Sequence, residues 1–122
     1  MKKLFVITLL FLAGCSPSID REEAPENLIE EKDMVEVMTE LMKLEGHVQS
    51  KYNQLTRYYK VIDKSADSLF KAHGYTSEQF QESFSYYADQ QGELLKIYQQ
   101  VLENLNKEIV ELELEEQKNH NN

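Results

Sequence analysis

Apolar residues recur at steps of three and four positions through most of this chain, which is the spacing of one face of a helix. The pattern predicts long helices over residues 28–50, 54–73 and 93–117, and a short one between Thr76 and a break at 89–92. We therefore expect an all-α fold, a small helical bundle of three long helices and one short helix.

Residues near the predicted helix ends support these boundaries. Asn27 can cap the first helix, with Glu30 three positions later in the arrangement of a capping box. Thr76 and Gln79 repeat this arrangement before the short helix, and Gly74 suits the left-handed position that follows a helix. We expect side-chain caps at Asn27 and Thr76.

The last predicted helix carries its apolar residues close to the heptad spacing of a coiled coil. We expect this seam to pack within its own bundle, and the alternative is a coiled coil between two copies of the chain. Val110 and Leu114 lie off the seam among glutamates, so the last turns should project into solvent. The seam consists of Leu94, Tyr98, Val101, Leu102, Leu105, Ile109 and Leu112.

The N-terminus has the parts of a bacterial lipoprotein signal. Residues 2 and 3 are lysines, residues 4–12 form an apolar run, and small residues 13 and 14 precede Cys15, the only cysteine. The run is too short to span a bilayer, which needs about 20 apolar residues. We predict that Cys15 receives a diacylglyceryl group. The alternatives are an ordinary cleaved signal peptide or a buried N-terminal helix.

This signal divides the chain into four predicted parts. They are a signal peptide (1–14), a lipidated cysteine with a flexible tether (15–26), a helical domain (27–117) and a disordered tail (118–122). Ser16, directly after the cysteine, resembles the signal that lets lipoproteins proceed to the outer membrane. We therefore expect a lipid-anchored envelope protein at the outer membrane, on its periplasmic or its exposed face.

Composition and charge exclude one class of partner. The chain has four glycines, two prolines and no tryptophan, which favours helix. Its formal charge is −9, and removing residues 1–14, which contain two lysines and no acidic residue, makes it −11. Phosphate backbones repel such a protein, so we expect no nucleic acid partner. Membrane attachment is expected to come from the lipid on Cys15.

Side chains that could perform catalysis or hold a metal are scattered along the sequence. None of His47, His73 and His120 lies three residues after a glutamate, so the paired motif of metal sites in helical bundles is missing. The HExxH motif and a glycine-rich phosphate loop are also missing. We predict no cofactor, no metal and no enzymatic activity.

The tyrosines are the more informative polar residues. Tyr58–Tyr59 and Tyr86–Tyr87 are adjacent pairs, and each should place one ring in the core and one at its edge. We select these four residues as candidates for protein binding. Together with the other three they could line a groove for a peptide or glycan, whereas ordinary amphipathic packing is the favoured alternative. The other three are Tyr52, Tyr75 and Tyr98.

Three stretches of the chain, over 25–41, 73–87 and 94–101, resemble a known family. The most specific is His-Gly-x-Thr-x-x-x-Phe-x-x-Ser-x-x-Tyr-Tyr at 73–87. The family is a group of small Bacteroidota lipoproteins known as a domain of unknown function, DUF4296. The resemblance implies an envelope location but no mechanism, and helix packing is the simplest role for its aromatic and serine positions.

These features together predict a non-catalytic protein-binding or structural module with an envelope protein as partner. We expect the contact to involve the face edged by the four paired tyrosines. The alternative is a carrier of a small apolar ligand in the bundle core or, further from the pattern, an enzyme.

Overall fold

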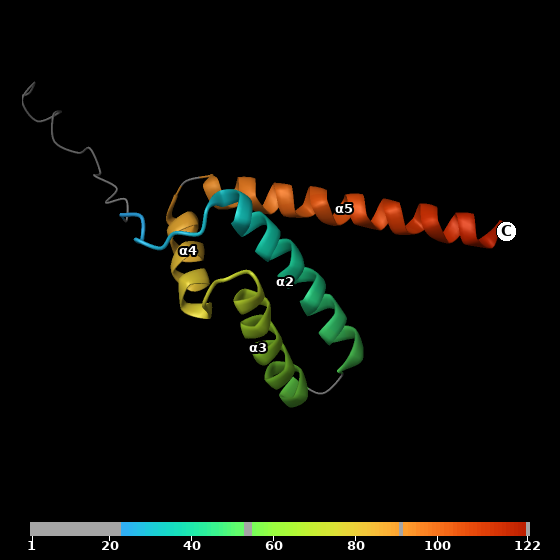
Figure 1. Cartoon of the computed structure of the whole chain (residues 1–122), viewed down its shortest axis with the longest axis horizontal. Coiled ribbons are helices and arrows are strands. Elements are labelled where there is room, and N and C mark those ends of the chain that lie inside the picture. Colours follow the sequence, from blue (N-terminus) through green and yellow to red (C-terminus); the bar gives the residue numbers. More distant parts are fainter. Residues whose placement is uncertain (1–22, 53–54, 91, 122) are drawn as a thin grey trace, which may run out of the picture.

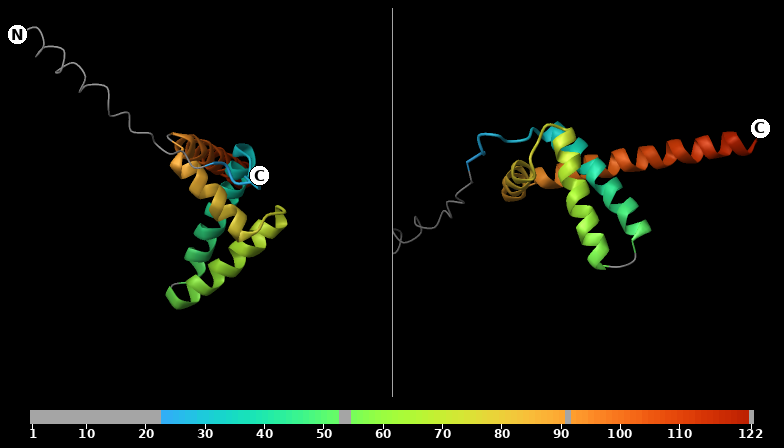
Figure 2. Two further views of the ribbon diagram at one scale, coloured as in Figure 1. Left: turned by 90° about the vertical axis from the view of Figure 1, so that its left-hand side faces the viewer. Right: turned by 60° about the horizontal axis from the view of Figure 1, so that its bottom comes forward.

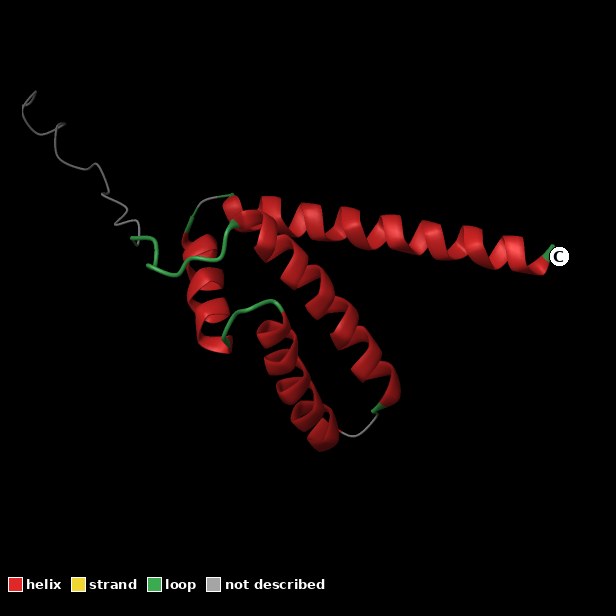
Figure 3. Cartoon of the chain, in the orientation of Figure 1, coloured by secondary structure: helices red, strands yellow, loops and turns green. Residues whose placement is uncertain are grey.

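The computed structural model describes residues 23–52, 55–90 and 92–121. In these residues the chain forms four helices and no strand, which confirms the predicted all-α fold class (Figure 3). None of the described helices is long and apolar enough to cross a membrane. In chain order the helices are α2 (Glu31–Lys51), α3 (Leu55–Ala72), α4 (Ser77–Asp89) and α5 (Glu93–His120).

The α2–α3 hairpin and α5 meet at one end of the molecule, beside α4, and separate toward the other (Figure 1). α2 and α3 form an antiparallel hairpin, α2 also packs against α5, and α4 contacts both α3 and α5. α5 begins beside α2 and then runs on past the other three helices (Figures 1 and 2). The C-terminus consequently lies at the far end of a projecting helix.

The core lies where the first turns of α2 and α5 meet the last turns of α4. Phe70 of α3 is also buried, and its ring stacks on Phe80 of α4 with centroids 4.5 Å apart, which ties the hairpin to α4. The buried residues of this cluster are Ile29, Met34, Val35, Met38, Tyr87, Ile97 and Val101, and Val37 and Val48 of α2 are buried as well.

Ile29 lies in the non-helical segment before α2 and fixes this segment to α4. Its N–H donates to the Ser83 hydroxyl at 3.0 Å, and the Tyr87 hydroxyl donates to its carbonyl at 2.7 Å. Ile29, Ser83 and Tyr87 are all buried, with exposed fractions of 1%, 0% and 6%. Buried N–H and C=O groups are costly when unpaired, so these two α4 side chains allow the segment to enter the core. We call these three residues the Ile29 clasp.

The Ile29 clasp explains why the predicted cap at Asn27 is wrong. α2 begins at Glu31, with Glu30 at the N-cap position, and no side chain caps it. Asn27 lies outside the helix, and its carbonyl accepts a hydrogen bond from the side-chain amide of Gln79 at 2.9 Å. Contacts with α4 thus hold residues 27–30 out of the helix, and they override the local capping signal.

The predicted start of α4 is confirmed. The Thr76 hydroxyl accepts a hydrogen bond from the N–H of Gln79 at 3.1 Å, which caps the helix. Gly74 has a φ of +81°, in the left-handed region that glycine adopts without strain. Only half of the capping box forms, because the Gln79 side chain is bonded to the Asn27 carbonyl.

α5 continues further than predicted. The helix ends at His120, so the predicted disorder of residues 118–122 is wrong for 118–120. The basic side chains of Lys118 and His120 lie in its last turn, where positive charge complements the helix dipole. Asn122, Cys15 and the predicted signal peptide lie outside the described residues.

Replacing Ser83 with alanine should destabilise the fold, because the buried N–H of Ile29 loses its acceptor. We expect the free energy of unfolding to fall by about 1–3 kcal/mol. Ser85→Ala, at an exposed serine of the same helix, should change it by less than about 0.5 kcal/mol. Urea titration followed by circular dichroism compares the two variants. Equal stabilities would contradict the role assigned to the Ile29 clasp.

Candidate functional site

The tyrosine pairs selected from the sequence lie in different surroundings. Tyr87 is buried and Tyr86 is half-buried at the edge of the core, with ring centroids 5.6 Å apart, as predicted for this pair. Tyr58 and Tyr59 lie in the first turns of α3 with centroids 5.4 Å apart. Tyr58 is half-buried and Tyr59 is 63% exposed, so the prediction of one core ring is wrong for this pair.

The two tyrosine pairs do not share a surface. The first turns of α3 lie at the tip of the α2–α3 hairpin, whereas the end of α4 lies beside the start of α5 (Figure 1). Tyr75 and Tyr98 pack against the core, and the Tyr75 hydroxyl donates to an Asp33 carboxylate oxygen at 2.8 Å. The structure therefore does not gather the tyrosines into one groove.

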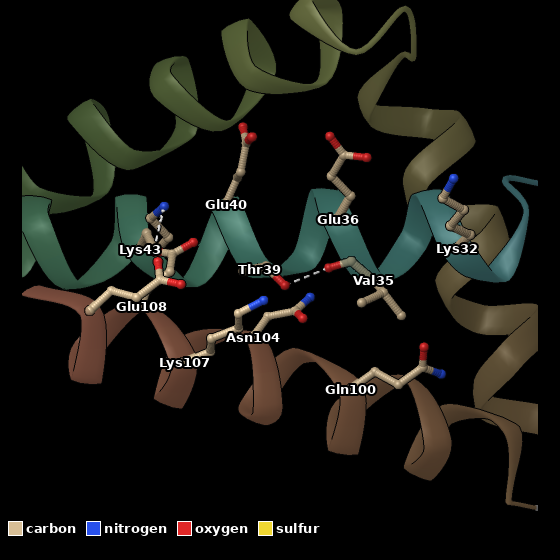
Figure 4. Close-up of a pocket in the computed structure, with 11 residues that line it drawn as sticks. Lys32, Val35, Glu36, Thr39, Glu40, Lys43, Gln100, Asn104, Lys107 and Glu108 are labelled. Carbon is tan, nitrogen blue, oxygen red and sulfur yellow. Dashed lines mark hydrogen bonds and ion pairs between the residues drawn. The ribbon is translucent and has the colours of Figure 1, made fainter.

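A groove of about 560 Å³ lies between α2 and α5 (Figure 4). Seven of the 11 residues that line it are charged. Lys43 contacts Glu108 at 2.8 Å, and this hydrogen bond raises the pKa of Lys43 above its usual value. The Thr39 hydroxyl donates to the carbonyl of Val35 in its own helix at 2.7 Å. The groove therefore holds an ion pair between α2 and α5, and its hydroxyl is bonded to the backbone of its own helix.

The histidines are not gathered either. The Nε2 atom of His73 lies 3.0 Å from a Glu40 carboxylate oxygen and links the end of α3 to α2. His47 lies on α2 and His120 at the end of α5, and both are exposed. Within the described residues, no group of three or more His, Cys, Asp or Glu side chains is placed to hold a metal ion.

The structure shows that much of the apolar seam along α5 is exposed, which the sequence reasoning missed. Leu95, Leu102 and Ile109 follow one another at seven-residue intervals, and their side chains are 62%, 54% and 53% exposed. Leu112 is 60% exposed and continues a second row at the same interval. The second row begins with two residues that pack partly against the core. The two rows form the α5 stripe, which consists of Leu95, Tyr98, Leu102, Leu105, Ile109 and Leu112.

The predicted packing of this helix within the bundle is correct only for its first half. Val101 is fully buried near the start of α5. α2 and α5 then diverge along their length (Figure 1), although Lys43 still contacts Glu108. Ile109 and Leu112 consequently stay more than half exposed. The seven-residue repeat from Leu95 to Ile109 is the sequence signal of the stripe, and the predicted seam does not include Leu95.

Two further apolar residues of α5 lie off the stripe. Val110 and Leu114 are 54% and 51% exposed, as predicted. Because successive residues of a helix point about 100° apart, Val110 faces a different direction from Ile109. Val110 and Leu114 are therefore about as exposed as the residues of the α5 stripe, but their side chains point in other directions.

Comparison with known protein families gives a match over most of the chain. Residues 25–111 match the model of the family described as Domain of unknown function (DUF4296). The chain belongs to the DUF4296 family. Searches of curated proteins and of solved structures found no match to the DUF4296 chain. The match covers α2, α3, α4 and the part of α5 that ends at residue 111.

In this DUF4296 domain, the residues of the 73–87 motif build the fold. Gly74 makes the turn after α3, and Thr76 caps α4. Ser83 and Tyr87 pair the backbone of Ile29. Burial raises the pKa of the Tyr87 phenol above its usual value, so its hydroxyl stays protonated and can donate to the Ile29 carbonyl. Helix packing is the role expected for the aromatic and serine positions, and the structure adds that Ser83 and Tyr87 pair a buried backbone.

The protection of backbone amides in this DUF4296 domain should fall sharply along α5. Amides near Val101 exchange only when the core opens, whereas the turns after Glu108 have little tertiary support, and a short helix alone is marginal in water. Hydrogen exchange read by mass spectrometry should show slow exchange over 97–104 and fast exchange over 110–120. Equal protection along α5 would contradict the claim that the turns after Glu108 have little tertiary support.

Proposed function

We propose that this protein is a lipid-anchored, non-catalytic module of the bacterial cell envelope that binds another protein through the α5 stripe. The observation that carries the proposal is the exposure of four large apolar side chains at regular spacing along one helix. Single exposed leucines are common on protein surfaces, but a continuous apolar stripe is typical of a face that a partner covers. The four residues are Leu95, Leu102, Ile109 and Leu112.

The anchor is proposed from the sequence of residues 2–15, in which a basic start, an apolar run and small residues precede Cys15. We propose the outer membrane as the location because Ser16 follows the cysteine. The acidic domain has no attraction of its own for an anionic bilayer, so the lipid must supply the attachment. Its acyl chains would do so through their buried methylenes.

The arrangement of the described chain suits a tethered binding module. Glu23, the first described residue, lies at the opposite end of the molecule from the C-terminus (Figures 1 and 2). α5 has 28 residues, and a rise of 1.5 Å per residue gives it a length of about 42 Å. A lipid at Cys15 would therefore leave the second half of α5 away from the anchored end.

The α5 stripe replaces the tyrosine pairs as the proposed contact. Tyr87 is buried and pairs the backbone of Ile29, so it is not available to a partner. Tyr59 is exposed, but the pocket it lines is formed by residues of α3 alone. We do not propose a carrier of an apolar ligand, because such a carrier needs an apolar cavity and the groove between α2 and α5 is mainly charged.

Replacing Cys15 with alanine should abolish membrane attachment, because alanine has no thiol to accept the diacylglyceryl group. We expect the variant to accumulate unprocessed or to leave the membrane fraction as soluble protein. Fractionation of cells followed by intact-mass analysis measures both the location and the lipid. Unchanged fractionation, or an unmodified thiol on the native protein, would overturn the anchoring proposal.

A photo-reactive amino acid at position 109 should crosslink to a partner protein in living cells, whereas the same residue at position 110 should not. Ile109 lies on the α5 stripe and Val110 lies off it, and their exposed fractions of 53% and 54% are matched. Adducts are measured by gel shift and mass spectrometry. Equal adduct yields from the two positions, or none from position 109, would contradict binding through the stripe.

A further inference from the structure

Acidic side chains surround the exposed half of the α5 stripe. Between residues 103 and 116 there are six glutamates and one lysine. In the heptad frame of the stripe, Glu113 follows one edge, and Glu108 and Glu115 follow the other. Glu108 is engaged by Lys43, while Glu113 and Glu115 are exposed and no other described helix lies beside them.

A second copy of this chain fits the stripe poorly in either direction. A parallel pair of α5 helices would place the two glutamate-rich ends side by side, and like charges at the edges of such a pair repel each other. An antiparallel pair would place each glutamate-rich end against the start of α5. There, Lys96 is already paired with Glu93 at 2.9 Å, and Asp89 lies nearby in the chain.

We infer that the α5 stripe receives a basic amphipathic helix of a partner protein. The inference rests on the proposed function and adds the chemistry of the partner. The apolar side of that helix would cover Leu102, Ile109 and Leu112, and lysines or arginines at its edges would reach Glu113 and Glu115. Both edges of the stripe end in carboxylates, so positive charge along both edges of the partner helix is favoured.

The length of the stripe also limits the partner. Leu95 and Leu112 are 17 residues apart, which corresponds to about 26 Å of helix at 1.5 Å per residue. A partner helix of about five turns would cover this distance. One end of the partner helix would lie beside the turns of α5 that pack on the core. Its other end would stabilise the last turns of α5, which no other described helix supports.

The test uses the lipidated full chain in nanodiscs of zwitterionic lipid, with empty nanodiscs as the background. The probe is a fluorescent synthetic peptide of leucine and lysine in an amphipathic helical pattern, about 18 residues long. The matched peptide carries glutamate in place of every lysine. We expect the lysine peptide to bind, binding to weaken as salt rises, and the glutamate peptide not to bind. Equal binding of the two peptides would overturn the inference.

Two pairs of variants locate the contact. Leu102→Gln with Ile109→Gln should weaken binding of the lysine peptide at least about tenfold, which corresponds to about 1.4 kcal/mol. Val110→Gln with Leu114→Gln removes two exposed apolar side chains that lie outside the stripe. This pair should change the affinity for the lysine peptide less than about twofold. Equal losses in the two pairs would overturn the contact with the stripe.

A second comparison isolates the charge. Glu113→Gln with Glu115→Gln should weaken the binding of the lysine peptide and reduce its dependence on salt. Glu78→Gln with Glu82→Gln removes two exposed carboxylates from α4 and should change neither. Salt dependence that is unchanged in the α5 variant would contradict the inferred role of its carboxylates.

The inference and the proposed function can fail separately. A partner crosslinked at position 109 together with no binding of the lysine peptide would overturn the basic helix and retain the module. A crosslink at position 109 to a second copy of this chain would overturn the inferred basic partner and show self-association. No crosslink at all would remove the proposed function and the inference with it.

Discussion

The fold depends on how one non-helical residue is buried. Ile29 enters the core before α2 begins, and a buried backbone outside a helix has no neighbours in its own chain segment to pair its N–H and C=O. Ser83 and Tyr87 of α4 supply both partners, at 3.0 Å and 2.7 Å. This pairing fixes where α2 starts and holds that start against α4, so the hydrogen bonds of one residue position two helices.

The exposure of the α5 stripe follows from that geometry. The core is formed by the first turns of α2 and α5 and the end of α4, so its apolar residues are concentrated at one end of the molecule. The α2–α3 hairpin and α5 then diverge, although Lys43 of α2 still contacts Glu108 of α5. Ile109 and Leu112 are thus uncovered because of the direction of α2, although their spacing matches that of buried positions.

The divergence of α2 and α5 separates the features that the sequence predicts from those that it does not. Helical periodicity correctly predicted the four helices, and the local chemistry of Gly74 and Thr76 correctly placed a turn and a cap. Periodicity shows which side of a helix is apolar but not what covers it, so the packing expected for Ile109 and Leu112 is wrong, whereas the exposure expected for Val110 and Leu114 is confirmed. Asn27 failed as a cap because a contact with Gln79, distant in sequence, competes with the local signal. The anchor at Cys15 stays a prediction.

The proposed lipid anchor and the inferred basic partner both involve the negative charge at the end of α5. A domain held at a membrane by lipid must keep its binding face free, and a surface rich in glutamate avoids anionic head groups. Six glutamates between residues 103 and 116 would serve this purpose at the end of α5 that lies furthest from the first described residue. The same carboxylates favour a basic partner helix over a second acidic chain. Charge that keeps α5 from the bilayer would thereby also select what binds it.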